Sequence, residues 1–211
     1  MKSCKIFSAL FALLGICAAA AGIYLSLHFR EAGPMLVKPS ESAEAQVHGL
    51  MYAVKENQFD RVGDMLYGQP DIGADRLPTE DVGTLLWEAF LDSLRYELDG
   101  EFYATESGVA RNMTVTTLDV ASVTDVLRDR AQTMLQDRVA HTADADDVYD
   151  QNNEYREEFV MAVLYDAAKS ALETDAKTVT YQITINLIYE NGQWWLMPEE
   201  PLLEAITGGF I

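Results

Sequence analysis

Cysteine is nearly absent from this sequence, which contains only Cys4 and Cys17. Both lie in or beside an apolar stretch near the N-terminus, so residues 18–211 contain no cysteine. A disulfide framework, a CxxC redox pair, a thiolate zinc site and a cysteine nucleophile are therefore excluded from that part of the chain.

Histidine and catalytic motifs are also scarce. The sequence has no GxSxG, HExxH, Walker or GxGxxG pattern, and its three histidines are His28, His48 and His141. General acid–base catalysis needs a titratable group held in a pocket, and we expect His48 alone to lie beside the core, near such a pocket. We favour a structural role for His48, and we predict no catalytic residue and no cofactor.

Basic residues are far outnumbered by acidic ones, with 15 Lys and Arg against 34 Asp and Glu and a formal net charge of -19. An acidic surface repels phosphate backbones and anionic headgroups, which argues against nucleic-acid binding and against a peripheral membrane-binding surface. One run of four aspartates invites comparison with a calcium loop: Asp144, Asp146, Asp147 and Asp150. Val148 and Tyr149 interrupt the spacing and no glycine makes the sharp turn, so we expect a solvated loop and no metal site.

The N-terminal region carries the strongest single signal. Residues 6–27 contain no charge, Asn, Gln or Pro, and a helix of about 20 apolar residues spans a bilayer. Lys2 and Lys5 precede this stretch, which places the N-terminus in the cytoplasm. We therefore expect residues 1–30 to be a cytoplasmic tip and transmembrane anchor, residues 31–40 a stalk, and residues 41–211 one extracytoplasmic domain at the cell membrane.

Two other interpretations of the N-terminal stretch stay open. A short cationic start before an apolar run also describes a cleavable signal peptide. The sequence at residues 14–17 is similar to a bacterial lipobox, although Ile16 stands where a small residue is expected. We favour the uncleaved anchor. All three interpretations place the rest of the chain outside the cytoplasm, and a cysteine-free exported domain is consistent with a bacterial protein.

The remaining sequence alternates between helical and strand patterns and predicts an α+β fold. Helical spacing of apolar residues recurs at 43–54, 58–66, 82–90, 123–139 and 160–171, and residues 201–207 can form a short final helix. Ser40 and Thr79 are expected as N-caps, Ser122 with Asp125 as a capping box, and Trp87 at the edge of its apolar stripe. A hairpin is expected over residues 96–119, with its turn at 106–108.

The terminal hairpin allows a finer prediction. Residues 177–190 alternate with period two, Asn191 and Gly192 suit a type I′ turn, and a return strand is expected to run to Pro198. A two-residue turn pairs residue 190 with 193, 189 with 194 and 187 with 196, so an apolar cluster faces away from the core: Ile188, Trp195 and Met197. This cluster either lies under another element, such as the last helix, or forms a surface that binds a protein partner or a second copy of the chain.

The order of elements resembles the nuclear transport factor 2-like (cystatin-like) superfamily. The local sequences at residues 53–60, running into Met65 and Leu66, and at residues 189–194 are similar to that group. The resemblance implies a cone-like curved antiparallel sheet wrapped on helices, and residues 122–172 would be an acidic helical insert. With its anchor and its ending at 202–209, the chain looks like uncharacterised surface proteins of Gram-positive bacteria. No catalytic residue of the superfamily's isomerases or dehydratases matches a position here.

Three functional hypotheses follow. The first is a non-enzymatic binding or interaction module, which would contact a small apolar ligand in a pocket or a partner at the Trp195 surface. The second is a small-pocket enzyme of the isomerase or hydratase type. The third is a structural spacer of the cell envelope. A buried carboxylate or histidine in a pocket would favour the enzyme, whereas a filled interior would favour binding or scaffolding.

Overall fold

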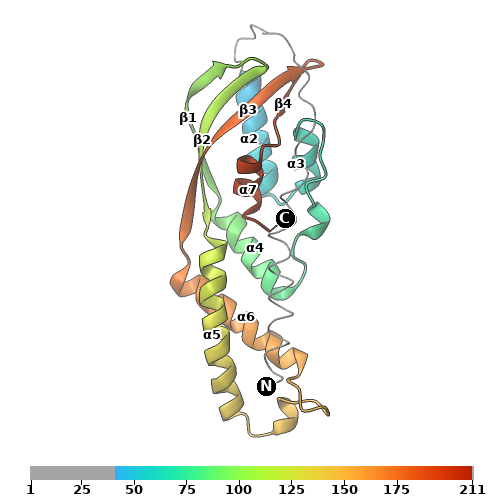
Figure 1. The fold of residues 1–211 in the computed structure, drawn as a ribbon, viewed down its shortest axis with the longest axis vertical. Helices are drawn as coiled ribbons and strands as arrows, with labels where there is room; N and C mark the ends of the chain where they lie inside the picture. Colours follow the sequence, from blue (N-terminus) through green and yellow to red (C-terminus); the bar gives the residue numbers. More distant parts are fainter. Residues whose placement is uncertain (1–40, 211) are drawn as a thin grey trace.

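The computed structural model describes residues 41–210, which form an α+β domain of six helices and one four-stranded antiparallel sheet (Figure 1). The predicted anchor and stalk lie outside the described residues, so the expectation of a membrane span is not addressed there. Within residues 41–210, no helix combines the length and the apolar character needed to cross a bilayer.

The sheet runs in the order β1-β2-β3-β4, with β1 and β4 at its edges. Its strands are β1 (Arg95–Ala104), β2 (Gly108–Leu118), β3 (Thr178–Glu190) and β4 (Gln193–Leu196). The predicted pairing of β3 with β4 is confirmed, from Leu187 opposite Leu196 to Glu190 opposite Gln193. Asn191 and Gly192 both have positive φ, of 55° and 84°, which is the backbone conformation that a type I′ turn requires.

Three helices pack against the sheet: α2 (Glu41–Lys55), α4 (Asp81–Ser93) and α7 (Glu200–Thr207). The short helix α3 (Phe59–Met65) packs against α2. The apolar stripe predicted for the first helix is fully buried, at Ala43, Val47, Leu50, Met51 and Val54. On β3 the predicted alternation also holds, because Ile183, Ile185 and Leu187 are buried while the intervening residues 182 and 184 are exposed.

Trp87 is more central than predicted. Its side chain is only 2% exposed, so it does not lie at the edge of the apolar stripe. The ring stacks on Phe90 at 5.2 Å between centroids and contacts Phe59 and Phe210 at 5.3 and 5.1 Å. Its indole Nε1 donates a hydrogen bond to Asn57 Oδ1 at 3.0 Å. Trp87 therefore joins α3, α4 and the C-terminal residues, which sequence spacing on a single helix could not show.

The predicted helical insert is a pair of helices, α5 (Val120–His141) and α6 (Glu157–Asp175), which extends beyond the end of the sheet (Figure 1). The two helices pack against each other, and α6 also contacts α4. Arg130 pairs with Asp175 and Arg138 pairs with Asp166, so two ion pairs link α5 to α6. Short 3₁₀ helices lie at Ala74–Arg76 and Ala145–Asp147.

Two predicted helix caps are wrong by a few residues. The N-cap of α4 is Glu80 and not Thr79, because the Glu80 carbonyl accepts the first helical hydrogen bond from Thr84 N at 2.7 Å. The N-cap of α5 is Asp119 and not Ser122, and the Asp119 carboxylate accepts a hydrogen bond from Ser122 N at 3.0 Å. Since β2 ends at Leu118, the chain enters α5 directly from the strand and leaves no linker for a later cap.

Candidate functional site

The predicted apolar cluster lies at the β3–β4 end of the sheet. Ile188 and Trp195 are direct cross-strand partners, and Met197 follows β4, which ends at Leu196 and not at the predicted Pro198. Met197 N still donates to Asn186 O at 2.8 Å, so the chain stays beside β3. All three side chains are half-buried. The role of this apolar cluster as a binding surface remains a prediction.

The last helix does not cover this cluster. The buried residues of α7 pack into the same core as the inward residues of β3: Leu202, Ala205 and Ile206. Ile188 belongs to the opposite set of the strand's alternating side chains, since Leu187 points into that core. Helix α7 therefore packs on the inner face of the sheet.

A surface hollow of about 330 Å³ lies directly beside Trp195 and is lined by Tyr67, Gly68, Gln69, Glu190, Asn191 and Trp195. The loop after α3 reaches it because Tyr67 N donates to Leu196 O at 2.7 Å. The negative charge of Glu190 is the main cause that raises the pKa of the Tyr67 phenol above its usual value, which places these two groups close together. The hollow thus combines two aromatic side chains with one carboxylate.

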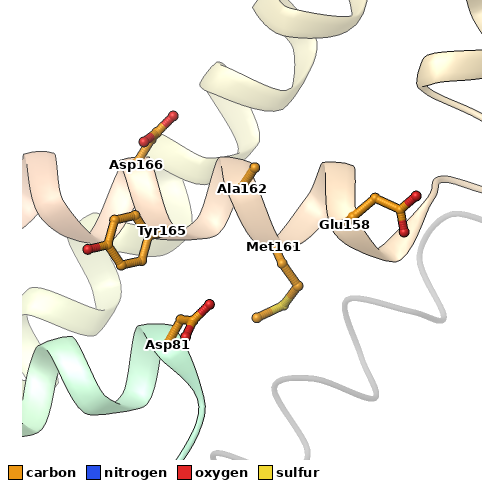
Figure 2. A pocket seen from close by; sticks show the side chains of 6 residues that line it. All are labelled: Asp81, Glu158, Met161, Ala162, Tyr165 and Asp166. Carbon is orange, nitrogen blue, oxygen red and sulfur yellow. The ribbon is translucent and has the colours of Figure 1, made fainter.

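A second hollow of about 420 Å³ lies between the start of α4 and one side of α6 (Figure 2). Its lining is acidic and partly apolar: Asp81, Glu158, Met161, Ala162, Tyr165 and Asp166. Asp166 is engaged by Arg138 of α5. The remaining carboxylates would attract cations, but no further feature of this hollow defines a ligand.

A polar cluster links α2 to the inward face of the sheet. Arg111 of β2 donates to Glu44 Oε2 at 2.9 Å, and its guanidinium carbon lies 5.3 Å from the centre of the Phe102 ring. His48 Nδ1 lies 2.6 Å from the Tyr96 hydroxyl, and His48 Nε2 lies 3.5 Å from Glu44 Oε1. The His48 side chain is 49% exposed, so the expectation that it lies near an interior pocket is wrong. It instead belongs to a hydrogen-bonded surface cluster.

This polar cluster predicts a pH-dependent contribution to stability. The hydrogen bond from Arg111 is the main cause that holds the pKa of Glu44 below its ordinary value of 4.5. A lowered folded-state pKa means that the stabilisation is present above the ordinary Glu pKa and is lost as the pH falls through the lowered value. Glu44→Gln should therefore destabilise the domain in urea unfolding at neutral pH, and the difference from the wild type should shrink at about pH 3.

The control for Glu44→Gln is Glu56→Gln, which neutralises an exposed acid just after the same helix. This control should leave stability nearly unchanged at both pH values, because exposed charges away from ion pairs contribute little. A destabilisation by Glu44→Gln that has the same size at both pH values would contradict an ionic role for Glu44.

The other candidate residues have local structural partners. His141 Nδ1 lies 2.7 Å from Asp137 O at the end of α5. Asp144 accepts a hydrogen bond from Asp146 N at 3.0 Å, and Asp150 accepts from the backbone of Asn152 and Glu154. In the part of the chain that the structure describes, no group of three His, Cys, Asp or Glu side chains could hold a metal ion. His28 lies outside that part.

No known protein family, curated protein or solved structure matches this chain. The hollow beside Trp195 is the feature that joins the predicted apolar cluster to polar groups able to orient a ligand, as binding sites usually do.

Proposed function

We propose that this chain is a membrane-anchored, extracytoplasmic binding or interaction module without catalytic activity, and that its contact surface is the cluster of Ile188, Trp195 and Met197. In this proposal residues 1–30 provide the single-pass anchor, with the N-terminus in the cytoplasm. The described residues form the domain outside, as a cone-like member of the nuclear transport factor 2-like superfamily. The ligand is a protein partner, a second copy of the chain or a small apolar molecule.

The observation that carries this proposal is the filled interior of the domain. Among residues 41–210, the fully packed core consists of apolar side chains, and the only buried polar residues are Thr117 and Thr207. The space between the sheet and its helices is occupied by large side chains such as Trp87, Phe90 and Met113. A filled interior directs ligands to the surface, where half-buried apolar side chains beside polar groups are typical of contact sites.

The enzyme hypothesis receives less support from the described residues. Acid–base catalysis requires a histidine or carboxylate in a water-excluded pocket. The described histidines, His48 and His141, are exposed, and the hollows beside Trp195 and between α4 and α6 are open depressions. The spacer hypothesis makes no use of the half-buried apolar cluster of Ile188, Trp195 and Met197, which is the feature that favours a binding role.

Trp195→Ala tests the proposed contact surface. Loss of a central aromatic side chain typically weakens an interface by about 2 kcal/mol or more, which is roughly a 30-fold loss of affinity. We expect the variant to fold normally, because Trp195 is only half-buried, and to lose partner capture or self-association. The measurement is crosslinking with a membrane-impermeant reagent on intact cells that express the full-length chain, followed by sedimentation of the solubilised protein.

Tyr103→Ala is the matched control, because Tyr103 is an aromatic residue that is 50% exposed at the opposite edge of the sheet, on β1. It should leave capture unchanged. Capture that survives Trp195→Ala would remove this surface from the proposal. A wild-type chain that the impermeant reagent never reaches would refute the extracytoplasmic placement.

A further inference from the structure

The hollow beside Trp195 is held in place by backbone hydrogen bonds. Tyr67 N donates to Leu196 O at 2.7 Å, and Gln69 N donates to Leu66 O at 3.0 Å. Gly68 and Gln69 both adopt positive φ, of 76° and 45°, so the chain turns sharply at this point. On the other side, the Asn191–Gly192 turn fixes Glu190 at the end of β3. Two hydrogen-bonded segments that are distant in sequence therefore form the walls of the hollow.

The hollow is lined by two aromatic rings and one carboxylate, together with the amide residues Gln69 and Asn191. Tyr67 is 38% exposed, and Trp195 is half-buried, with its Nε1 lying 3.4 Å from Glu190 O. The lining contains no Lys, Arg or His, and in the described part of the chain no ion pair engages Glu190. Aromatic faces attract organic cations through their quadrupole, and a neighbouring carboxylate adds direct charge attraction.

The net charge of the whole chain also favours a cationic ligand. With a formal net charge of -19, the chain raises the local concentration of cations and repels anions. A neutral sugar or an apolar side chain could stack on Trp195, but neither would use the Glu190 carboxylate as an ionic partner. The Glu190 carboxylate is hydrogen-bonded by Tyr67, but no ion pair in the described part of the chain engages it. The combination of an aromatic pair with an acid that lacks an ionic partner selects a ligand that is both apolar and positively charged.

We propose that the hollow formed by Tyr67, Glu190 and Trp195 binds an alkylammonium group, with the aromatic rings contacting its carbon atoms and Glu190 balancing its charge. This inference deepens the proposed binding function and rests on it, since it gives the Trp195 surface a ligand of defined chemistry. The cation belongs either to a free small molecule or to a lysine side chain of a partner, and the two share the same recognition chemistry.

The test compares a cation with a neutral molecule of the same shape. Choline and 3,3-dimethylbutan-1-ol differ in that a carbon replaces the charged nitrogen. The full-length chain, solubilised in detergent and labelled with fluorotryptophan, has three tryptophans, and Trp195→Phe assigns the signal of Trp195 in fluorine NMR. We expect choline to shift that signal in a saturable way in the millimolar range, and the neutral analogue to have little effect.

Glu190→Gln keeps the shape of the side chain and removes its charge. It should weaken choline binding by about three- to fivefold, which is the range of an exposed ion pair. Glu97→Gln makes the same charge change at an exposed site on β1, at the far edge of the sheet, and should leave binding unchanged. The same titration is repeated with N-acetyl-lysine amide in place of choline. If N-acetyl-lysine amide saturates the Trp195 signal at a lower concentration than choline, the ligand is a lysine side chain; the reverse order indicates a free quaternary amine.

Three results would overturn the inference: equal binding of the neutral analogue, unchanged choline binding by Glu190→Gln, or no saturable shift with either cation. Failure of the broader proposal is distinguishable from these outcomes. If the crosslinking assay captures a partner through Trp195 while neither cation binds, the binding function stands and the cation site is refuted. If the cations bind and no capture occurs, the partner-binding function is refuted.

Discussion

Trp87→Ala is expected to destabilise the domain by about 3–5 kcal/mol, the usual cost of truncating a large buried aromatic side chain. The indole is 2% exposed and contacts three aromatic rings, those of Phe59, Phe90 and Phe210. Its removal also leaves Asn57 Oδ1 without its 3.0 Å hydrogen bond. Because domains are typically stable by only about 5–15 kcal/mol, this single change should remove much of the total stability.

Urea unfolding followed by far-ultraviolet circular dichroism measures this effect. Trp87→Phe separates the two contributions, because it keeps an aromatic ring in the cluster and removes the Nε1 hydrogen bond to Asn57. It should cost less than the alanine variant. An alanine variant that unfolds at the wild-type urea concentration would show that Trp87 does not join the helices in the way described.

Gly108→Ala is the second change with a large expected effect. A Cβ atom at this position would lie 2.0 Å from Leu187 O, on the backbone of the neighbouring strand, and 3.0 Å from Ile188 Cα. The contact is with backbone atoms, so no side-chain rotation can relieve it, and β2 and β3 must separate locally. We expect a loss of about 1–3 kcal/mol or somewhat more, as is typical of overpacking.

Thermal unfolding and amide hydrogen exchange of β3 would measure the effect of Gly108→Ala. Ser107→Ala is the matched control, because Ser107 is the preceding residue, exposed in the loop before β2. The control should leave both the melting temperature and the exchange of residues 187–189 unchanged. Equal stability of the two variants would mean that the strands are not as close at Gly108 as the structure indicates.

The elements of this fold could be predicted wherever the relevant information is local. The period-two pattern of β3 and the Asn191–Gly192 turn determine the pairing of Ile188 with Trp195, because a two-residue turn allows only one register. Helix caps were less predictable, since Asp119, Ser122 and Thr79 are all residue types that can cap a helix. The end of the preceding strand decides between Asp119 and Ser122, and that is a tertiary property.

Only the part of the candidate site that depends on local sequence could be predicted. Trp195 and Ile188 are placed by a local turn, but Tyr67 reaches the same surface through a hydrogen bond to Leu196, more than a hundred residues away in sequence. The Arg111–Glu44 ion pair likewise joins residues separated by 67 positions. The period of apolar residues in a single sequence reports contacts within one element and not contacts between distant elements.

The helical pair α5–α6 and the β3–β4 turn lie at opposite ends of the molecule's long axis (Figure 1). Helix α5 has 22 residues, which corresponds to a rod of about 33 Å. A ligand or partner bound at Trp195 therefore leaves the α5–α6 end of the molecule accessible. A second partner could bind that end without steric competition. An elongated domain of this kind can connect two binding partners that do not contact each other.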